Sequence, residues 1–383
     1  MKKICVVVGS RANYGSIRSA MRAIQRHSAL ELQLVVAASA LLDRYGAVIK
    51  LIEQDGFTPL AKVPILIEGE TPLTMAKSTG LGLIELSTTF EQLKPDIVLT
   101  VGDRFETMAT TLAAAYMNIP IAHTMGGEVS GTIDESIRHA VTKFAHIHFP
   151  ASKSAHERII RLGELPENVH LVGCPRVDLT AEILCQNDGM LGEALFQTGV
   201  GASFNLGEPF LLVSQHPVTT EYGEGESQIT TTLEAVRDTG LPAIMLWPNA
   251  DAGSDDIAKG IRKWRERGQV QRTHFFKNLP TVVYVWLMKK TACLVGNSSS
   301  GIREGAFIGT PVVNIGTRQA MRERGRNVLD VSHSMREICD AIRSQVAHGP
   351  YPSESIYGDG CAGERIASIL ANSSVSIQKH MSY

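Results

Sequence analysis

Carboxylates gather in two short segments of the first half of the chain. Residues 101–106 read Val-Gly-Asp-Arg-Phe-Glu, and residues 123–139 read His-Thr-Met-Gly-Gly-Glu-Val-Ser-Gly-Thr-Ile-Asp-Glu-Ser-Ile-Arg-His. Both begin where an apolar run stops, and the carboxyl ends of parallel strands line the ligand crevice of an open sheet. Carboxylates whose neighbours separate their pKa values can divide the work of general acid and general base. Asp103, Glu128 and Asp134 are therefore candidates for proton transfer.

Part of this cluster also has a simpler explanation. Asp134 and Arg138 lie one helical turn apart, and such pairs stabilise a helix surface without doing any chemistry. Arg104, Glu106, Glu135 and His139 fit the same explanation. The carboxylates Asp103, Glu128 and Asp134 are harder to explain in this way, because paired carboxylates can separate the acid and base roles when neighbours push their pKa values apart.

The second half contains a candidate phosphate site. Residues 296–304 read Gly-Asn-Ser-Ser-Ser-Gly-Ile-Arg-Glu and directly follow the apolar run 293–295. Small residues at a strand-to-helix turn let backbone amides and hydroxyls approach a phosphate. The alternative is a serine N-cap with Glu304 completing a capping box. We favour the phosphate site, formed by Ser298, Ser299, Ser300 and Gly301, with Glu304 placed to accept hydrogen bonds from a ribose.

Three further loops carry polar candidates. Arg11 follows the first apolar run and could meet a diphosphate, but residues 9–15 lack the G-x-G-x-x-G spacing, so a dinucleotide cofactor is not supported. His216 follows the first apolar run of the second half, in a position where most histidines are structural. Asn249 and Asp251 are candidates for sugar binding, although turn chemistry is the stronger explanation for them.

No metal site is predicted. His146 and His148 alternate on one face of a predicted strand, but no third ligand stands at a suitable spacing. We interpret both as structural.

Two series of alternating strands and helices place these residues. Apolar, β-branched runs at 4–8, 32–37, 96–101, 120–123 and 147–150 alternate with helical patterns, which include 14–26 and 40–53. A second series has strands at 210–214, 243–247, 273–276, 292–295 and 311–314. The pattern weakens between residues 184 and 209. The sequence therefore predicts two α/β domains, 1–190 and 191–362, each a doubly wound parallel sheet of the Rossmann-like type, with a cleft between them. A Ser-rich tail from Asn372 to Tyr383 is expected to fray.

Composition excludes several classes of partner. The chain has 37 Lys and Arg against 39 Asp and Glu, a net charge of −2, so it has no general attraction to nucleic acid or to an anionic membrane. No apolar stretch approaches the ~20 residues that span a bilayer. The six cysteines are scattered without disulfide or metal spacing, which favours reduced thiols and a cytoplasmic location.

Seven ordered motifs together resemble the hydrolysing UDP-N-acetylglucosamine 2-epimerases, in particular the branch that supplies N-acetylmannosamine-type sugars for sialic, legionaminic and related acids. The motifs are residues 9–15, 102–105, 126–134, 136–139, 215–220, 296–299 and 316–319. The resemblance implies a glycosyltransferase-B type of fold, in which a C-terminal segment, 363–383, packs back on the first domain. It also implies a UDP-sugar substrate, a homodimer, and no metal or nicotinamide cofactor.

The resemblance also assigns roles to residues. It implies that Ser298 to Gly301 hold the diphosphate, Glu304 the ribose and Tyr284 the uracil, and that Arg11 and Arg318 contact the phosphates. Asp103, Asp134, Arg138 and His216 match positions around the sugar, where His123 is a further candidate contact.

One departure affects the catalytic assignment. Many members carry a glutamate two residues after the histidine that matches His123, and this chain has Met125 there. Either Glu128 takes over the role of that glutamate, or the acid and base are divided differently. The departure is also compatible with a 2,4-diacetamido-trideoxy sugar or a GDP-linked substrate.

The expected reaction is an elimination followed by hydration. A cleft carboxylate, Asp103 or Asp134, removes the C2 proton while nucleotide diphosphate leaves C1. Water then adds to C1 of the resulting glycal, and a proton returns to C2 from the opposite face with help from Glu128, Asp134 or His216. The alternatives are a glycosyltransferase, which would need an acceptor, and a non-catalytic protein that only binds nucleotide sugars.

Overall fold

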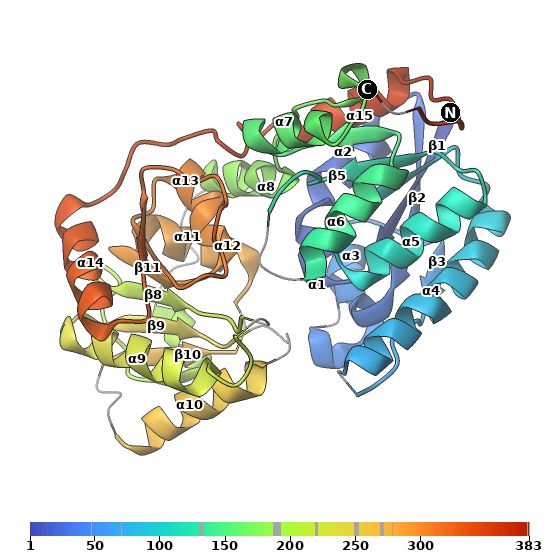
Figure 1. Cartoon of the computed structure of the whole chain (residues 1–383). Coiled ribbons are helices and arrows are strands. Elements are labelled where there is room, and N and C mark those ends of the chain that lie inside the picture. The colour runs from blue at the N-terminus through green and yellow to red at the C-terminus, as the bar shows by residue number, and fades with distance from the viewer. Residues whose placement is uncertain are drawn as a thin grey trace. The chain divides into compact units, whose positions relative to one another are not determined.

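Two units make up the chain. The computed structural model describes residues 1–46, 48–69, 71–129, 133–186, 193–218, 221–248, 253–268, 272–277, 279–380 and 382. The first unit comprises Met1–Val129, Ile133–Leu179 and the segment from Tyr357 onward, and the second comprises Thr180–Ile356 (Figure 1).

The sheet of the first unit has six parallel strands in the order β3-β2-β1-β4-β5-β6. They are β1 (Lys2–Val8), β2 (Leu30–Ala37), β3 (Ala61–Val63), β4 (Ile97–Val101), β5 (Ile121–Thr124) and β6 (Ile147–Phe149). The strand order reverses between β1 and β4. This reversal is a topological switch point, where the loops at the carboxyl ends of an open sheet part to form a ligand site.

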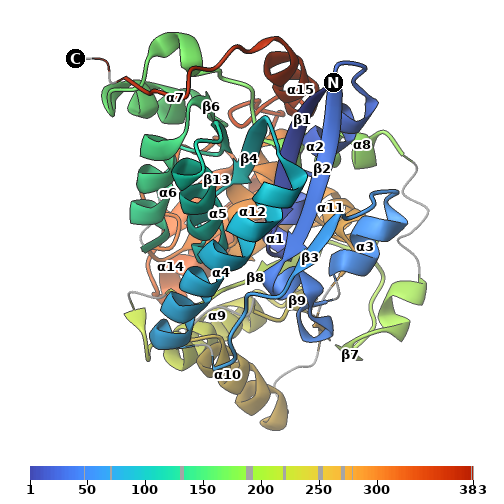
Figure 2. The ribbon, with the colours of Figure 1, turned by 90° about the vertical axis from the view of Figure 1, so that its right-hand side faces the viewer.

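Helices cover both faces of this sheet. They are α1 (Arg11–Gly15), α2 (Arg18–Arg26), α3 (Val48–Gln54), α4 (Pro72–Leu93), α5 (Phe105–Tyr116), α6 (Ile133–Phe144), α7 (Lys153–Arg161), α8 (Pro175–Leu184), which runs into the second unit, and α15 (Ala362–Asn372), with short 3₁₀ helices η1 (Ala38–Leu41), η2 (Asp43–Tyr45) and η3 (Pro166–Asn168). Alternate residues of β1 enter different cores: Ile4 and Val6 pack with α2 and α15, while Cys5 and Val7 pack with α4 and α5. Figure 2 shows α4 beside α5.

The sheet of the second unit has seven strands in the order β13-β12-β11-β8-β9-β10-β7. They are β7 (Val200–Gly201), β8 (Leu211–Ser214), β9 (Ala243–Leu246), β10 (Thr273–Phe276), β11 (Cys293–Gly296), β12 (Val312–Ile315) and β13 (Val328–Val331), and all pairs are parallel except β7 with β10. The helices are α9 (Gly225–Asp238), α10 (Ser254–Glu266), α11 (Thr281–Lys290), α12 (Ser299–Ile302), α13 (Glu304–Ile308) and α14 (Met335–His348), with η4 (Glu193–Gln197) before β7. The predicted pair of parallel-sheet α/β units is therefore present.

The last helix belongs to the first unit. Helix α15 packs on α2 so closely that a Cβ at Gly363 would lie 2.6 Å from the carbonyl carbon of Ser19 (Figure 1). Asp178 accepts hydrogen bonds from the amides of Ala362 (2.9 Å) and Gly363 (2.7 Å), which satisfies two of the donors that a helix start leaves open. The chain end is thus fixed to the sheet that contains the N-terminal strand.

The expectation that the tail frays is wrong. His146 Nε2 donates to the carbonyl of Ile377 (3.0 Å), and the amide of Ser382 donates to the carbonyl of Gly163 (2.9 Å). Lys379 donates to two carbonyls of α6. Backbone and side-chain hydrogen bonds therefore hold the described part of the tail against α6 and the α7 loop.

None of the helices that the structure describes combines the length and the apolar composition that crossing a bilayer requires.

Candidate functional site

Asp103, Glu128 and Arg138 meet at the carboxyl end of β4. Asp103 lies two residues beyond this strand, and Arg138 projects from α6 with only 2% of its side chain exposed. One guanidinium nitrogen, Nη2, pairs with Asp103 Oδ2, and the other, Nη1, donates to the carbonyl of Glu128 (2.9 Å). A buried guanidinium is costly without an anion, so this pair fixes Asp103 in place. The structure thus pairs Asp103 with Arg138, and the same guanidinium holds the backbone carbonyl of Glu128.

His123 supports the turn that carries Asp103. Its ring is fully buried, and burial lowers the pKa of His123 to about 3, so the imidazole is neutral. Its Nε2 donates to the carbonyl of Gly102 (2.8 Å), and its Nδ1 lies 3.5 Å from Thr142 Oγ1. The ring therefore supports Gly102, the residue before Asp103. The contact of His123 with a sugar stays a prediction.

Asp134 and Glu128 flank this pair. Asp134 lies in the first turn of α6, one turn before Arg138, and Glu128 is buried. Met125, which replaces the glutamate of many relatives, has φ +62° and packs against the core of the first unit. A thioether has no proton to donate or accept at neutral pH, so proton transfer has to come from the carboxylates.

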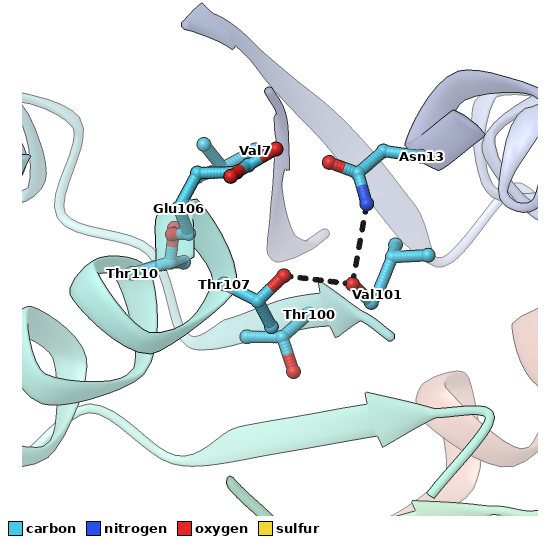
Figure 3. A pocket seen from close by; sticks show the side chains of 7 residues that line it. All are labelled: Val7, Asn13, Thr100, Val101, Glu106, Thr107 and Thr110. Atoms are coloured by element: carbon cyan, nitrogen blue, oxygen red, sulfur yellow. Dashed lines mark hydrogen bonds between the residues drawn. The ribbon is translucent and has the colours of Figure 1, made fainter. Parts of the chain in front are cut away.

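A small crevice at the carboxyl end of β4 is lined by side chains of β1, α1, β4 and α5 (Figure 3). Asn13 Nδ2 (3.3 Å) and Thr107 Oγ1 (2.8 Å) both donate to the carbonyl of Val101, and Figure 3 shows the two side chains converging on it. Glu106 is 2% exposed and lies over Gly9, where an added Cβ would fall 2.4 Å from its Cγ. Asn13 of α1 and Thr107 of α5 thus bind the same carbonyl at the end of β4, two residues before Asp103.

Two arginines lie together at the start of α1. Arg11 is its first residue, and burial, with the nearby charge of Arg176, lowers the pKa of Arg11. Arg176 Nε donates to Ser16 Oγ (3.1 Å), and its Nη2 donates to the carbonyl of Ala12 (3.3 Å). Adjacent cations favour an anionic ligand. The sequence analysis identified Arg11 but missed Arg176, which is 165 positions away and belongs to no recognised motif.

In the second unit, Asn297 connects the candidate loops. Its side chain accepts from the amide of His216 (2.7 Å) and donates to the carbonyl of the same residue (2.9 Å). Its own carbonyl accepts from Arg318 Nη1 (3.2 Å) and Gln319 Nε2 (2.9 Å). The loops that follow β8, β11 and β12 are thereby joined. The sequence placed His216 and Arg318 at the site and missed the connecting role of Asn297.

The serine turn and Tyr284 form one hydroxyl cluster. Ser298 caps α12, and its Oγ lies 2.8 Å from Ser300 Oγ, which is 2.6 Å from the Tyr284 hydroxyl. Glu304 begins the separate helix α13 and is buried. The capping-box alternative for Glu304 is wrong, because the residue at the third helical position after Ser298 is Gly301.

His216 is neutral in this arrangement. Burial, together with the nearby charge of Arg318, lowers the pKa of His216 to about 3. Its Nε2 lies 3.4 Å from Ser214 Oγ. The ring is therefore a hydrogen-bonding group beside a fixed cation.

The remaining predictions fall elsewhere. Asn249 and Asp251 lie outside the described residues. His148 bonds to Glu164 and His146 to the tail, in agreement with their interpretation as structural. Over the described part of the chain, no three His, Cys, Asp or Glu side chains are grouped as a metal ion would need.

A family model described as UDP-N-acetylglucosamine 2-epimerase matches residues 22–371. The chain belongs to this family. Among curated relatives, the UDP-N,N'-diacetylbacillosamine 2-epimerase (hydrolyzing) of Legionella pneumophila is 32% identical over 97% of this chain and 96% of its own. The UDP-N-acetylglucosamine 2-epimerase of Neisseria meningitidis serogroup B is 29% identical over 99% of this chain and 98% of its own. The family predicted from the motifs is confirmed.

Solved structures of 2-epimerases share the fold. The Neisseria meningitidis UDP-GlcNAc 2-epimerase bound to UDP-GlcNAc matches with a TM-score of 0.83 at 17% identity, covering 97% of this chain and 100% of that one. The structure of S. aureus MnaA with UDP matches with a TM-score of 0.79 at 20% identity, covering 97% of this chain and 96% of that one. The glycosyltransferase-B type of fold predicted from the sequence is confirmed.

Proposed function

We propose that this chain is a hydrolysing 2-epimerase that converts a UDP-linked N-acetyl amino sugar into UDP and the free sugar inverted at C2. Membership of the 2-epimerase family supports the proposal. The observation that carries it is the Asp103 carboxylate held by buried Arg138 at the carboxyl end of β4, beside the switch point of the sheet.

The reaction needs a base at C2 and stabilised charge at C1. Asp103 or Asp134 takes the C2 proton, the C2–H electron pair forms the C1–C2 double bond, and the C1–O bond breaks to release UDP. Water then adds its hydroxyl to C1 of the glycal, and a proton returns to C2 from the opposite face. Glu128 and Asp134 are the groups that we assign to this second proton transfer.

The leaving diphosphate carries the charge that develops in the first step. We assign Arg11, Arg318 and the serine turn 298–301 to its stabilisation, because fixed cations and donors lower the energy of developing negative charge. Glu304 is assigned to the ribose hydroxyls and Tyr284 to the uracil. The homodimer and the cytoplasmic location expected from the sequence stay predictions.

The sugar that we favour is the 2,4-diacetamido-2,4,6-trideoxy type. Relatives named for diacetylbacillosamine, from Legionella pneumophila and Campylobacter jejuni, are each 32% identical to this chain.

Turnover in deuterated water tests the function. We expect incubation with UDP-N,N'-diacetylbacillosamine, and in parallel with UDP-N-acetylglucosamine, to release one UDP per free sugar, with deuterium at C2 visible by NMR. A glycosyltransferase would release no 2-epimerised sugar without an acceptor, and a binding protein would release nothing. Product that keeps its C2 proton and its original configuration would contradict the proposal.

The pH profile tests the role of His216. Because its pKa of about 3 lies below the ordinary value of a histidine, the ring gains a proton only under strong acid and is neutral from about pH 5 to 9. We expect His216→Asn to lower kcat/KM by roughly five- to tenfold at every pH in this range, the value of a lost hydrogen bond. The acidic limb of the kcat/KM profile should not move. A limb near 6.5 that disappears in the variant would instead make His216 the acid or base.

A further inference from the structure

A buried cluster joins the C-terminal tail to the body of the first unit. Glu164, which is 1% exposed, accepts from Lys143 Nζ (3.0 Å), His148 Nε2 (3.1 Å) and Lys379 Nζ (2.5 Å). Burial raises the pKa of Glu164, but hydrogen bonds from His148 and Lys379 outweigh this effect and lower the pKa to about 2. An ionised carboxylate therefore anchors the ammonium of Lys379, a residue more than 200 positions away in the sequence.

The same ammonium binds the end of α6. Lys379 Nζ donates to the carbonyls of Thr142 (3.1 Å) and Lys143 (2.8 Å), in the last turn of this helix. The last four carbonyls of an α-helix have no partner within it, and a cation placed there also complements the helix dipole. A lysine of the tail thus fills the place that a capping residue of α6 itself would take.

This turn of α6 is directly connected to the candidate acid–base groups. Thr142 lies one turn after Arg138, and its Oγ1 donates to the Arg138 carbonyl (3.0 Å). The same Oγ1 lies 3.5 Å from Nδ1 of His123, whose Nε2 holds the carbonyl next to Asp103. A shift of the α6 end therefore displaces both supports of Asp103: the Arg138 guanidinium and the His123 ring.

We propose that Lys379 is a positioning residue, through which the C-terminal tail fixes α6 and so holds Arg138 and Asp103 in their reactive arrangement. The kinetic part of this inference rests on the proposed function. A tail that only stabilised the fold would change the melting temperature without changing the motion of α6 or the rate of C2 proton abstraction.

The test compares the full-length chain with Lys379→Met and Lys379→Arg. Lys62→Met is the matched control, because Lys62 pairs with Glu53 on an exposed face of the same unit. Hydrogen exchange of peptides covering α6 is measured first, since this readout does not require turnover. We expect amide exchange in the last turns of α6 to rise about tenfold in Lys379→Met, to stay near the wild-type rate in Lys379→Arg, and to be unchanged in Lys62→Met.

The kinetic readout separates positioning from stability. We expect kcat for deuterium incorporation at C2 to fall about tenfold in Lys379→Met, a loss typical of small misplacements at a site. UDP affinity should be unchanged, because the groups assigned to UDP, namely Arg11 and residues of the second unit, belong neither to α6 nor to the tail. Lys379→Arg should restore most of kcat because its guanidinium supplies the same charge and donors. Circular dichroism confirms that each variant is folded at the assay temperature.

Two results would overturn the inference. One is α6 exchange in Lys379→Met equal to the wild-type rate. The other is faster α6 exchange with unchanged kcat, which would make the tail a structural tie only. If the wild-type chain itself failed to epimerise either sugar, the proposed function would fall, while the exchange measurement would still decide whether Lys379 holds α6.

Discussion

Replacing Asp103 by Asn is expected to lower kcat by about 10² to 10⁴-fold, the contribution of a positioned general base, while UDP affinity stays within about twofold of wild type. The amide keeps the shape of the side chain and can still accept a hydrogen bond from Arg138, but it cannot take a proton from C2. The UDP contacts that we assign to the second unit involve no atom of Asp103. Deuterium incorporation at C2 by NMR and a calorimetric UDP titration measure the two quantities.

The variant should also be less stable. Arg138 is 2% exposed and Asp103 25% exposed, so the substitution leaves a buried guanidinium without its counter-charge. Breaking such a pair costs about 3 kcal/mol at the lower end of the known range, which we expect here because the Asn carbonyl is retained. Thermal unfolding measures this loss, and assays must be run well below the lowered midpoint.

Asp96→Asn is the matched control for this variant. Asp96 precedes β4 at the end opposite to Asp103 and accepts from the amide of Lys3 (2.7 Å). It should lose stability without losing turnover. If Asp103→Asn retained wild-type kcat, Asp103 would be excluded as the base and the assignment would pass to Asp134.

Much of the fold follows from apolar periodicity. The predicted strands 210–214 and 273–276 correspond to β8 and β10 with ends within one residue. Strands β3 and β13 were missed: β3 has three residues, and β13 exposes its two central side chains, so neither gives the continuous apolar run of a central strand. Short edge strands are held by their neighbour's backbone, which the sequence pattern does not contain.

Two predicted helices are broken in the structure. The helix predicted over 14–26 is divided into α1 and α2, with Ser16 Oγ bonded back to the carbonyl of Ala12. The segment 40–53 forms η1, η2 and α3, because Gly46 takes φ +92° between them. In the first break, the amide of Ile17, directly after Ser16, donates three residues back to Tyr14 in place of the helical partner. In the second break, Gly46 takes a left-handed backbone conformation that ends η2 before α3 begins.

The residues of the candidate site were also only partly predictable from the sequence. Asp103 and Arg138 were predictable, since their chemistry and their place after apolar runs point to the same sheet edge. Asn297 was not, because an asparagine in a loop is usually turn chemistry and its role depends on three loops meeting. The role of Lys379 could not be predicted from the sequence, because its partners lie more than 200 residues away in the chain.

Gly296→Ala is expected to destabilise the second unit strongly. Gly296 ends β11 with φ +132°, and an added Cβ would lie 2.2 Å from the carbonyl oxygen of Ser214, its partner in β8. The strained backbone costs roughly 1–3 kcal/mol, and the clash adds roughly 1–3 kcal/mol because two paired strands cannot separate freely. Since the next residue is Asn297, relief of the clash also moves the loops that Asn297 joins. We expect a large loss of UDP affinity and a lower melting temperature.

Gly240→Ala separates the two causes. Gly240 has φ +72° and no atom within 4 Å of an added Cβ, so its substitution carries the backbone strain alone, roughly 1–2 kcal/mol. The melting temperature of Gly296→Ala should therefore be well below that of Gly240→Ala, and only Gly296→Ala should weaken UDP binding. Equal losses of stability with UDP affinity retained in both variants would show that β8 and β11 can separate without disturbing Asn297, and the close approach of these strands would then not be what holds the serine turn in place.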